Sequence, residues 1–211
     1  TTGSTILTNI ELSPPGILVW RSLLQWLGGI GVIVMAIAIF PMLSVGGMQL
    51  FKAENFETPE KVVPRATSLT RGIFIIYSVL TIIWASLLYL SGMSSFDSIL
   101  HSMTTIATGG YSTKSGSIGS FNSQIIDWVI ILGMIFGSLP FVHYLAMTKG
   151  SYRDLVNDSQ VRWFLVLLTI LVLTIFSLLL LNGTYDWKNS IRYSAFNVTS
   201  ILTGTGYGTA D

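Results

Sequence analysis

Two short stretches rich in threonine, glycine and tyrosine carry the groups that could do chemistry. The first, T-T-I-A-T-G-G-Y-S-T, spans residues 104–113, and the second, I-L-T-G-T-G-Y-G-T, spans residues 201–209. Neither stretch contains a carboxylate, an imidazole or a thiol. Glycine permits backbone conformations with positive φ that let successive carbonyl groups point the same way, and threonine adds an uncharged hydroxyl. Such a stretch can coordinate a weakly hydrated cation with its backbone carbonyl oxygens.

Three copies of this pattern occur along the chain. Aligned on their Gly-Tyr pairs, the two stretches place Gly110 opposite Gly206, 96 residues further on, and the N-terminal T-T-G-S-T is a partial copy with Gly3 in the matching position. We name residues 1–5, 108–113 and 204–209 the first, second and third Gly/Thr segments. A period this long does not fit a solenoid repeat; it favours a repeated unit of span, re-entrant half-helix, loop and span. The lack of carboxylates favours potassium over calcium, which prefers carboxylate ligands.

The composition is typical of a membrane protein. The 211 residues are 51% hydrophobic and only 10% charged, whereas a soluble domain carries about 25% charged residues. A bilayer-spanning helix needs about 20 mainly apolar residues, and four segments satisfy this: residues 17–40, 72–90, 125–147 and 163–181. The chain has no cysteine, which excludes disulfides and thiolate metal sites.

The distribution of lysine and arginine predicts the orientation of these spans. Seven basic residues lie in the two loops at residues 42–71 and 146–162, namely Lys52, Lys61, Arg65, Arg71, Lys149, Arg153 and Arg162. The opposite side has three, namely Lys114, Lys188 and Arg192. Because basic loops stay in the cytoplasm, we expect the three Gly/Thr segments to face outside.

A short helix is expected before each complete Gly/Thr segment. Ser94 or Ser95 can cap the first, with Asp97 in its first turn. Apolar residues then recur at helical spacing and predict one apolar face, made of Phe96, Ile99, Leu100 and Met103. This helix has about 14 residues, too few to span a bilayer of ordinary thickness, and residues 189–202 repeat the plan. We therefore expect an all-α membrane protein with four transmembrane helices and two re-entrant pore helices.

The chain resembles the Trk-type subunit of the Trk/Ktr/HKT superfamily of potassium transporters. The residues that carry the resemblance are L-S-P-P-G-I-L-V-W-R-S-L-L-Q-W-L-G-G-I-G-V-I-V-M-A-I-A-I-F-P at 12–41 and T-T-I-A-T-G-G-Y-S-T with the G-S-I-G that follows. In that family four span–pore loop–span repeats surround one pore with pseudo-fourfold symmetry. The resemblance implies the end of the first filter and second span of repeat one at residues 1–50, a complete repeat two at 51–150, and repeat three through its filter at 151–211. We expect the chain to be a fragment of a longer reading frame.

The resemblance also implies the ion-binding residues, the ion and the partners. The backbone that lines the ion path would be that of Thr1, Thr2, Gly3, Thr108, Gly109, Gly110, Gly204, Thr205 and Gly206. Some sodium-preferring plant relatives carry serine at the position of Gly3, so glycine there points to potassium. The expected activity is potassium uptake across a bacterial inner membrane, with K⁺ as transported ion, no covalent cofactor and no nucleic acid. Expected partners are membrane lipid, a second copy in a homodimer and a cytoplasmic regulatory subunit that senses NAD(H) or ATP.

Three other functions compete with transport by this family. A two-span potassium channel built from identical subunits is disfavoured by two different complete Gly/Thr segments in one chain. A membrane enzyme would need His101, His143 or Asp127 to converge, but the predicted orientation puts His101 outside and His143 near the inside. A non-conducting membrane scaffold, in which the Gly/Thr segments only pack, stays open. We therefore expect no enzymatic activity.

A few polar and glycine residues within the spans need a separate interpretation. Arg21 and Gln25 lie one helical turn apart near the outer end of the first span; Arg21 either snorkels to the interface or bonds to a pore-helix end. His101, His143 and Asp127 are expected in packing or interface roles, with Asp127 paired with water. Close packing is expected at five glycines, namely Gly133 and Gly137 in G-x-x-x-G and Gly28, Gly29 and Gly31 in the first span.

Overall fold

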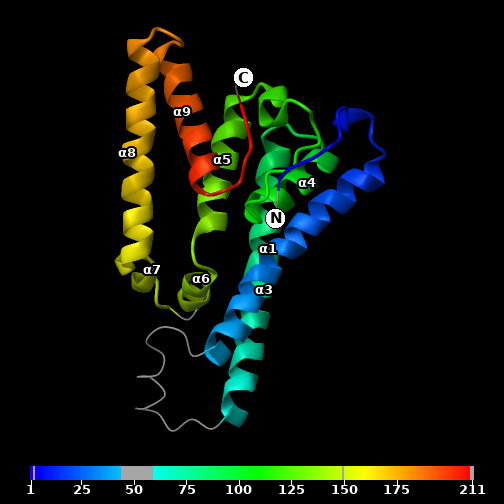
Figure 1. Cartoon of the computed structure of the whole chain (residues 1–211), viewed down its shortest axis with the longest axis vertical. Helices are drawn as coiled ribbons and strands as arrows, with labels where there is room; N and C mark the ends of the chain where they lie inside the picture. The colour runs from blue at the N-terminus through cyan, green and yellow to red at the C-terminus, as the bar shows by residue number, and fades with distance from the viewer. Residues whose placement is uncertain (2, 44–58, 149, 210–211) are drawn as a thin grey trace.

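The computed structural model describes residues 1, 3–43, 59–148 and 150–209, and every regular element among them is helical (Figure 1). The elements, in chain order, are η1 (Ile10–Leu12), α1 (Pro15–Leu43), α3 (Pro59–Leu90), α4 (Ser95–Ile106), η2 (Ser117–Phe121), α5 (Gln124–Ser138), α6 (Phe141–Thr148), α7 (Arg153–Asn157), α8 (Ser159–Leu181) and α9 (Trp187–Leu202). Thr2, Lys52 and Lys149 lie outside the described residues. The loop predicted over residues 42–71 is wrong from Pro59 onward, where α3 already begins.

Three helices of the described chain are long and apolar enough to cross a membrane. They are Pro15–Met35 within α1, Ser68–Leu90 within α3, and the whole of α8. These agree with three of the four predicted spans. The helices α5 and α6, with 15 and 8 residues, are too short to span alone and pass the same test only together, with a bend of 88° between them. The structure therefore contains three continuous candidate spans and a fourth that is broken.

The break between α5 and α6 corrects the expectation of one straight span over residues 125–147. Leu139 adopts an extended conformation, φ −74° and ψ 149°, which is the conformation that a following proline imposes. Pro140 has no N–H to donate to the Phe136 carbonyl four residues earlier. The Tyr144 hydroxyl takes that place and donates to the Phe136 oxygen at 2.8 Å. The freed carbonyl is thus satisfied within the protein, as an apolar surrounding requires.

The helix α4 begins as predicted but buries a different face. Ser94 caps it by accepting from the Asp97 N–H at 3.0 Å. Of the predicted apolar face, Leu100 is buried, whereas Ile99 is 52% exposed. The buried side of α4 is instead mostly polar, formed by Ser98, Leu100, His101, Ser102, Thr104, Thr105 and Ile106. The Ser98 and Ser102 hydroxyls donate to carbonyl oxygens of α4 itself, whereas the Thr104 hydroxyl, in the last turn, donates to the Tyr111 carbonyl oxygen beyond the helix.

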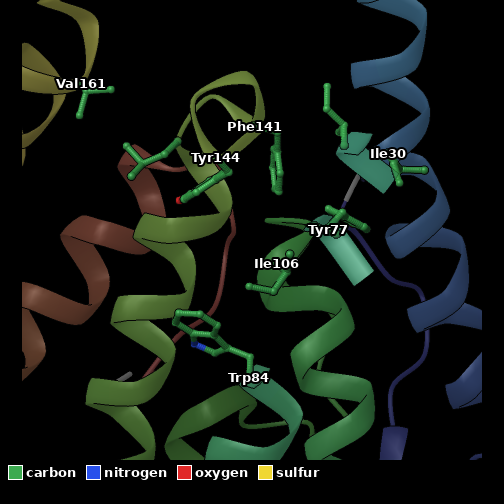
Figure 2. Packing of buried hydrophobic residues seen from close by; sticks show 10 residues of the cluster. Ile30, Tyr77, Trp84, Ile106, Phe141, Tyr144 and Val161 are labelled. Carbon is green, nitrogen blue, oxygen red and sulfur yellow. The ribbon is translucent and has the colours of Figure 1, made fainter. Parts of the chain in front are cut away.

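Two apolar clusters hold the helices around α4. One gathers Tyr77 of α3, Ile106 of α4, and Phe141 and Tyr144 of α6, as Figure 2 shows. The other contains Leu88, Met134, Phe196 and Tyr207 with further residues of α5. Together they place α4 against α1, α3 and α5, and α9 against α5 and α8.

Four of the five glycines expected at close contacts lie at such contacts. A Cβ on Gly133 would lie 2.6 Å from the Thr105 methyl group, and one on Gly137 would lie 2.7 Å from the Ile106 carbonyl oxygen. In α1, Gly29 packs against Ala107 and Gly28 against Thr1. Gly31 has nothing within 4 Å of its added Cβ, so the expectation fails there.

A buried ion pair joins α5 to α9. The Arg192 Nε donates to Asp127 Oδ2 at 2.6 Å, and the two side chains are 9% and 1% exposed. The expectation that Asp127 faces water is therefore wrong. A carboxylate out of water needs a partner charge, and the sequence places that partner 65 residues further on, in the second short helix.

Removing one charge of this pair tests how much it holds α9 in place. Asp127→Asn leaves the Arg192 guanidinium without its counter-charge, which should cost about 3 kcal/mol of stability. The matched control is Asp158→Asn at the start of α8, because Asp158 is more exposed and asparagine also caps helices well. The apparent melting temperature of the purified protein in detergent should fall clearly for Asp127→Asn and little for Asp158→Asn. Equal shifts for the two variants would contradict the account.

Candidate functional site

The second and third Gly/Thr segments leave their helices with the same backbone geometry. The φ angles are positive at Thr108 and Gly110 (49° and 78°), and at Gly204 and Gly206 (74° and 85°). These positions are equivalent in the alignment by 96 residues, so alternate residues are left-handed in both segments. Glycine adopts this conformation without penalty, whereas Thr108 holds it at a cost of about 1–2 kcal/mol. The repeated pattern in the sequence is thus a repeated backbone conformation.

Each of the two segments is braced by a hydroxyl of its own helix. The Thr104 hydroxyl donates to the Tyr111 carbonyl oxygen at 2.9 Å, and the Ser200 hydroxyl donates to the Tyr207 carbonyl oxygen at 2.7 Å. Thr104 and Ser200 are again 96 residues apart, and both are fully buried. The last turn of each helix therefore supplies the hydrogen bond that non-helical backbone in an apolar surrounding requires.

A second pair of bonds ties the far end of each segment to the same helix. The Thr113 hydroxyl donates to Asp97 Oδ1 of α4 at 2.6 Å. In the third segment, the Asn197 amide of α9 donates to the Thr209 hydroxyl at 3.2 Å. The second segment is therefore held to α4 at Tyr111 and Thr113, and the third is held to α9 at Tyr207 and Thr209.

The three Gly/Thr segments converge in the fold. A Cβ on Gly3 would lie 3.0 Å from the Gly109 carbonyl oxygen, and one on Gly110 would overlap the Thr205 carbonyl oxygen. Gly109 and Thr205 occupy equivalent positions, so a carbonyl of each segment abuts the glycine of the segment before it. Space favours glycine at both contacts, and at Gly110 the positive φ of 78° favours it as well.

The tyrosines of the segments also reach the preceding copy. Tyr207 is 3% exposed, and its hydroxyl lies 2.5 Å from the Thr104 hydroxyl and 3.3 Å from that of Thr105, both in α4. With Tyr207 as donor, the single hydroxyl hydrogen of Thr104 remains for the Tyr111 carbonyl. The Tyr111 hydroxyl in turn donates to the Ser4 carbonyl oxygen of the first segment at 2.9 Å. These links were not predicted, although the shared Gly-Tyr pair was their signal.

Gln25 of α1 contacts the second segment directly. Its amide nitrogen donates to the Gly109 carbonyl oxygen at 2.6 Å, and its amide oxygen accepts from the Tyr111 N–H at 3.0 Å. Arg21, one turn earlier, lies with its guanidinium carbon 4.2 Å from the centre of the Tyr111 ring. The structure thus gives Arg21 a cation–π contact, which neither of its two interpretations from the sequence included.

The two histidines lie in packing and interface roles, as expected. His101 is fully buried, with its ring nitrogens at 2.8 Å from the Asp97 carbonyl and 3.0 Å from the Ser112 hydroxyl. His143 of α6 lies 3.0 Å from Asp158, the capping residue of α8. Within the described residues, no group of three or more His, Cys, Asp or Glu side chains is arranged to hold a metal ion.

An exposed clasp joins the chain after the first segment to the loop after the second. Glu11 accepts from the Ser115 N–H at 2.7 Å and from the Ser115 hydroxyl at 2.5 Å. The hydroxyl bond, followed by the backbone bond, lowers the pKa of Glu11 to about 2. This carboxylate is therefore ionised at neutral pH, the state in which it accepts both bonds.

Comparison with known proteins places this geometry among cation transport proteins. Residues 1–211 match the TrkH family, described as cation transport protein. The Trk system potassium uptake protein TrkI of Halomonas elongata is 42% identical over 100% of this chain and 43% of that protein. TrkH of Vibrio parahaemolyticus is 36% identical over 99% of this chain and 44% of its own. The crystal structure of the potassium transporter TrkH from the same species has a TM-score of 0.85 at 32% identity, covering 99% of this chain and 42% of that chain. The chain thus spans less than half the length of these relatives.

The tyrosine link between the second and third copies can be tested by removing one hydroxyl. Tyr207→Phe keeps the ring in its cluster but removes its bonds to Thr104 and Thr105, which should cost about 1 kcal/mol. Tyr111→Phe is the matched control, because it removes a single hydrogen bond, to the Ser4 carbonyl, that is more exposed than those of Tyr207. The apparent melting temperature should fall more for Tyr207→Phe than for Tyr111→Phe. The reverse order would show that the hydroxyl of Tyr207 does not join the copies.

Proposed function

The chain belongs to the TrkH family of cation transport proteins, and we propose that it forms part of the pore subunit of a Trk-type potassium uptake system. It is an all-helical, multi-pass membrane protein with bacterial Trk relatives, and those relatives are named potassium uptake proteins. One observation carries the proposal. Two Gly/Thr segments share left-handed residues and hydroxyl braces 96 residues apart, and they converge with Gly3 of the first.

In this proposal K⁺ is the transported ion, and backbone oxygens replace its water shell. The oxygens are contributed by Thr1, Thr2, Gly3, Thr108, Gly109, Gly110, Gly204, Thr205 and Gly206, of which Thr2 lies outside the described residues. The absence of carboxylates from the segments favours a monovalent ion. The helices α4 and α9 end at the second and third segments, so the negative ends of their dipoles favour a cation there.

The driving force is the electrochemical gradient of potassium. A membrane potential supplies about 2.3 kcal/mol per unit charge for each 100 mV. No bond is made or broken in such a step. The protein contributes a path lined by carbonyl groups that are already held in place, so little free energy is spent on moving them when the ion binds.

The remaining parts of the pore are proposed to lie in other repeats of a longer protein. We assign residues 1–50 to the end of repeat one, 51–150 to repeat two and 151–211 to repeat three, with α4 and α9 as re-entrant pore helices in a pseudo-fourfold arrangement. The relatives are more than twice as long as this chain, which leaves room for a fourth repeat. The protein is proposed to form a homodimer in a bacterial inner membrane and to bind a cytoplasmic regulator that senses NAD(H) or ATP, through the cytoplasmic surface to which residues 42–71 and 146–162 contribute.

Replacement of Gly110 tests the role of the second segment. Gly110→Ser adds a Cβ at φ +78° that meets the Thr205 carbonyl, so the carbonyls must shift. The longer protein that carries this sequence is expressed in cells without their own potassium uptake, and K⁺ and Na⁺ uptake are measured. We expect the preference for potassium to fall by roughly tenfold, equivalent to about 1.4 kcal/mol.

The control is Gly183→Ser, since Gly183 also has positive φ, at +62°, but nothing within 4 Å of an added Cβ. It should reduce the amount of protein at most, without changing ion preference. Potassium uptake that continues with unchanged preference in Gly110→Ser would contradict the assignment of this segment.

A further inference from the structure

The side chain of Gln25 uses both ends of its amide on the second Gly/Thr segment. It is 2% exposed, it donates to the Gly109 carbonyl at 2.6 Å, and it accepts from the Tyr111 N–H at 3.0 Å. These two backbone groups lie on either side of Gly110. A single side chain from α1 therefore sets the orientation of the peptide groups that flank the left-handed residue of the segment.

The base of this side chain is itself held in place. The Trp26 indole donates to the Thr81 hydroxyl at 2.9 Å, and the Tyr77 hydroxyl donates to the Trp26 carbonyl at 2.9 Å. Both bonds tie α1 to α3 directly beside Gln25. A polar group on a rigid helix with fixed neighbours can position another group accurately.

The bond to Gly109 distinguishes the second segment from the third. The equivalent carbonyl of the third segment, that of Thr205, abuts Gly110, as the Gly109 carbonyl abuts Gly3. The Gly109 oxygen also receives the Gln25 amide. A carbonyl oxygen has two lone pairs, so one remains available when the other is taken by the amide.

We propose that Gln25 is a positioning residue that determines ion preference by holding the Gly109 carbonyl in place. This inference rests on the proposed function. A sodium ion is smaller than a potassium ion, so carbonyl oxygens must approach one another more closely to replace its water shell. The amide of Gln25 pulls the Gly109 oxygen toward α1 and opposes that approach. The pinned carbonyl thereby favours the larger ion.

Three variants of the longer protein test this proposal in cells that lack their own potassium uptake. Gln25→Leu removes both bonds. Gln25→Glu keeps an acceptor for the Tyr111 N–H but removes the donor to Gly109. Gln25→Met keeps the length of the side chain without either bond. Uptake of K⁺ and Na⁺ is measured beside the amount of protein in the membrane.

The expected result is that all three variants still take up potassium while losing roughly fivefold of their preference over sodium, the effect of about one hydrogen bond. Gln124→Leu and Gln124→Glu are matched controls, because Gln124 is exposed at the start of α5. These controls should leave the preference unchanged. A general folding defect lowers the amount of protein, and with it K⁺ and Na⁺ uptake together, so it leaves the ratio of the two ions unchanged.

The outcomes separate the two proposals. Potassium uptake with an unchanged ion ratio in the Gln25 variants overturns the role of Gln25 and leaves the proposed function intact. An equal shift of the ion ratio in the Gln124 controls also overturns it, because the effect would then not be specific to Gln25. Loss of all three Gln25 variants from the membrane overturns it too, because the amide would then act on folding in general. Absence of potassium uptake by the unsubstituted protein overturns the proposed function, and this inference with it.

Discussion

Backbone that leaves a helix in an apolar surrounding must find hydrogen-bond partners within the protein, and the rest of this structure depends on that constraint. The Thr104 and Ser200 hydroxyls meet it in the second and third Gly/Thr segments. The Tyr144 hydroxyl meets it at the break between α5 and α6. Three side-chain hydroxyls of a very hydrophobic chain thus bond to the backbone carbonyls that lack a helical partner.

In the tyrosine and carbonyl contacts between Gly/Thr segments, each segment reaches the segment that precedes it in the chain. Tyr207 of the third segment reaches α4 of the second copy, and Tyr111 of the second reaches Ser4 of the first. The abutting carbonyls follow the same order, from Thr205 to Gly110 and from Gly109 to Gly3. A Cβ added to Gly3 or Gly110 therefore pushes on a carbonyl of the following segment. A single added atom can thus displace a carbonyl that we propose to bind the ion.

Local patterns in the sequence predicted the features that depend on neighbours along the chain. Hydropathy located three spans, the cap of α4 was narrowed to Ser94 or Ser95, of which Ser94 caps the helix, and the Gly-Tyr pairs revealed a period that the φ angles share. The length of the apolar run alone predicted one span over residues 125–147, although Pro140 signals the break at Leu139. The buried side of α4 differs from the predicted apolar face, because Thr104 is buried where it holds the Tyr111 carbonyl, and Ser98 and Ser102 are buried with their hydroxyls bonded to their own helix. The pair of Asp127 with Arg192, and that of Gln25 with Gly109, join residues 65 and 84 positions apart, and no local pattern in one sequence encodes such distances.

The central claim is that the carbonyls of the converging Gly/Thr segments bind a monovalent cation. The most direct test is a crystal structure of the longer protein soaked with rubidium, a heavier substitute for potassium, in which anomalous scattering locates the ion. The account predicts a peak within coordination distance of backbone oxygens from the segments that contain Gly3, Gly110 and Gly206. An ordered rubidium peak elsewhere along the ion path, with none beside these segments, would contradict it.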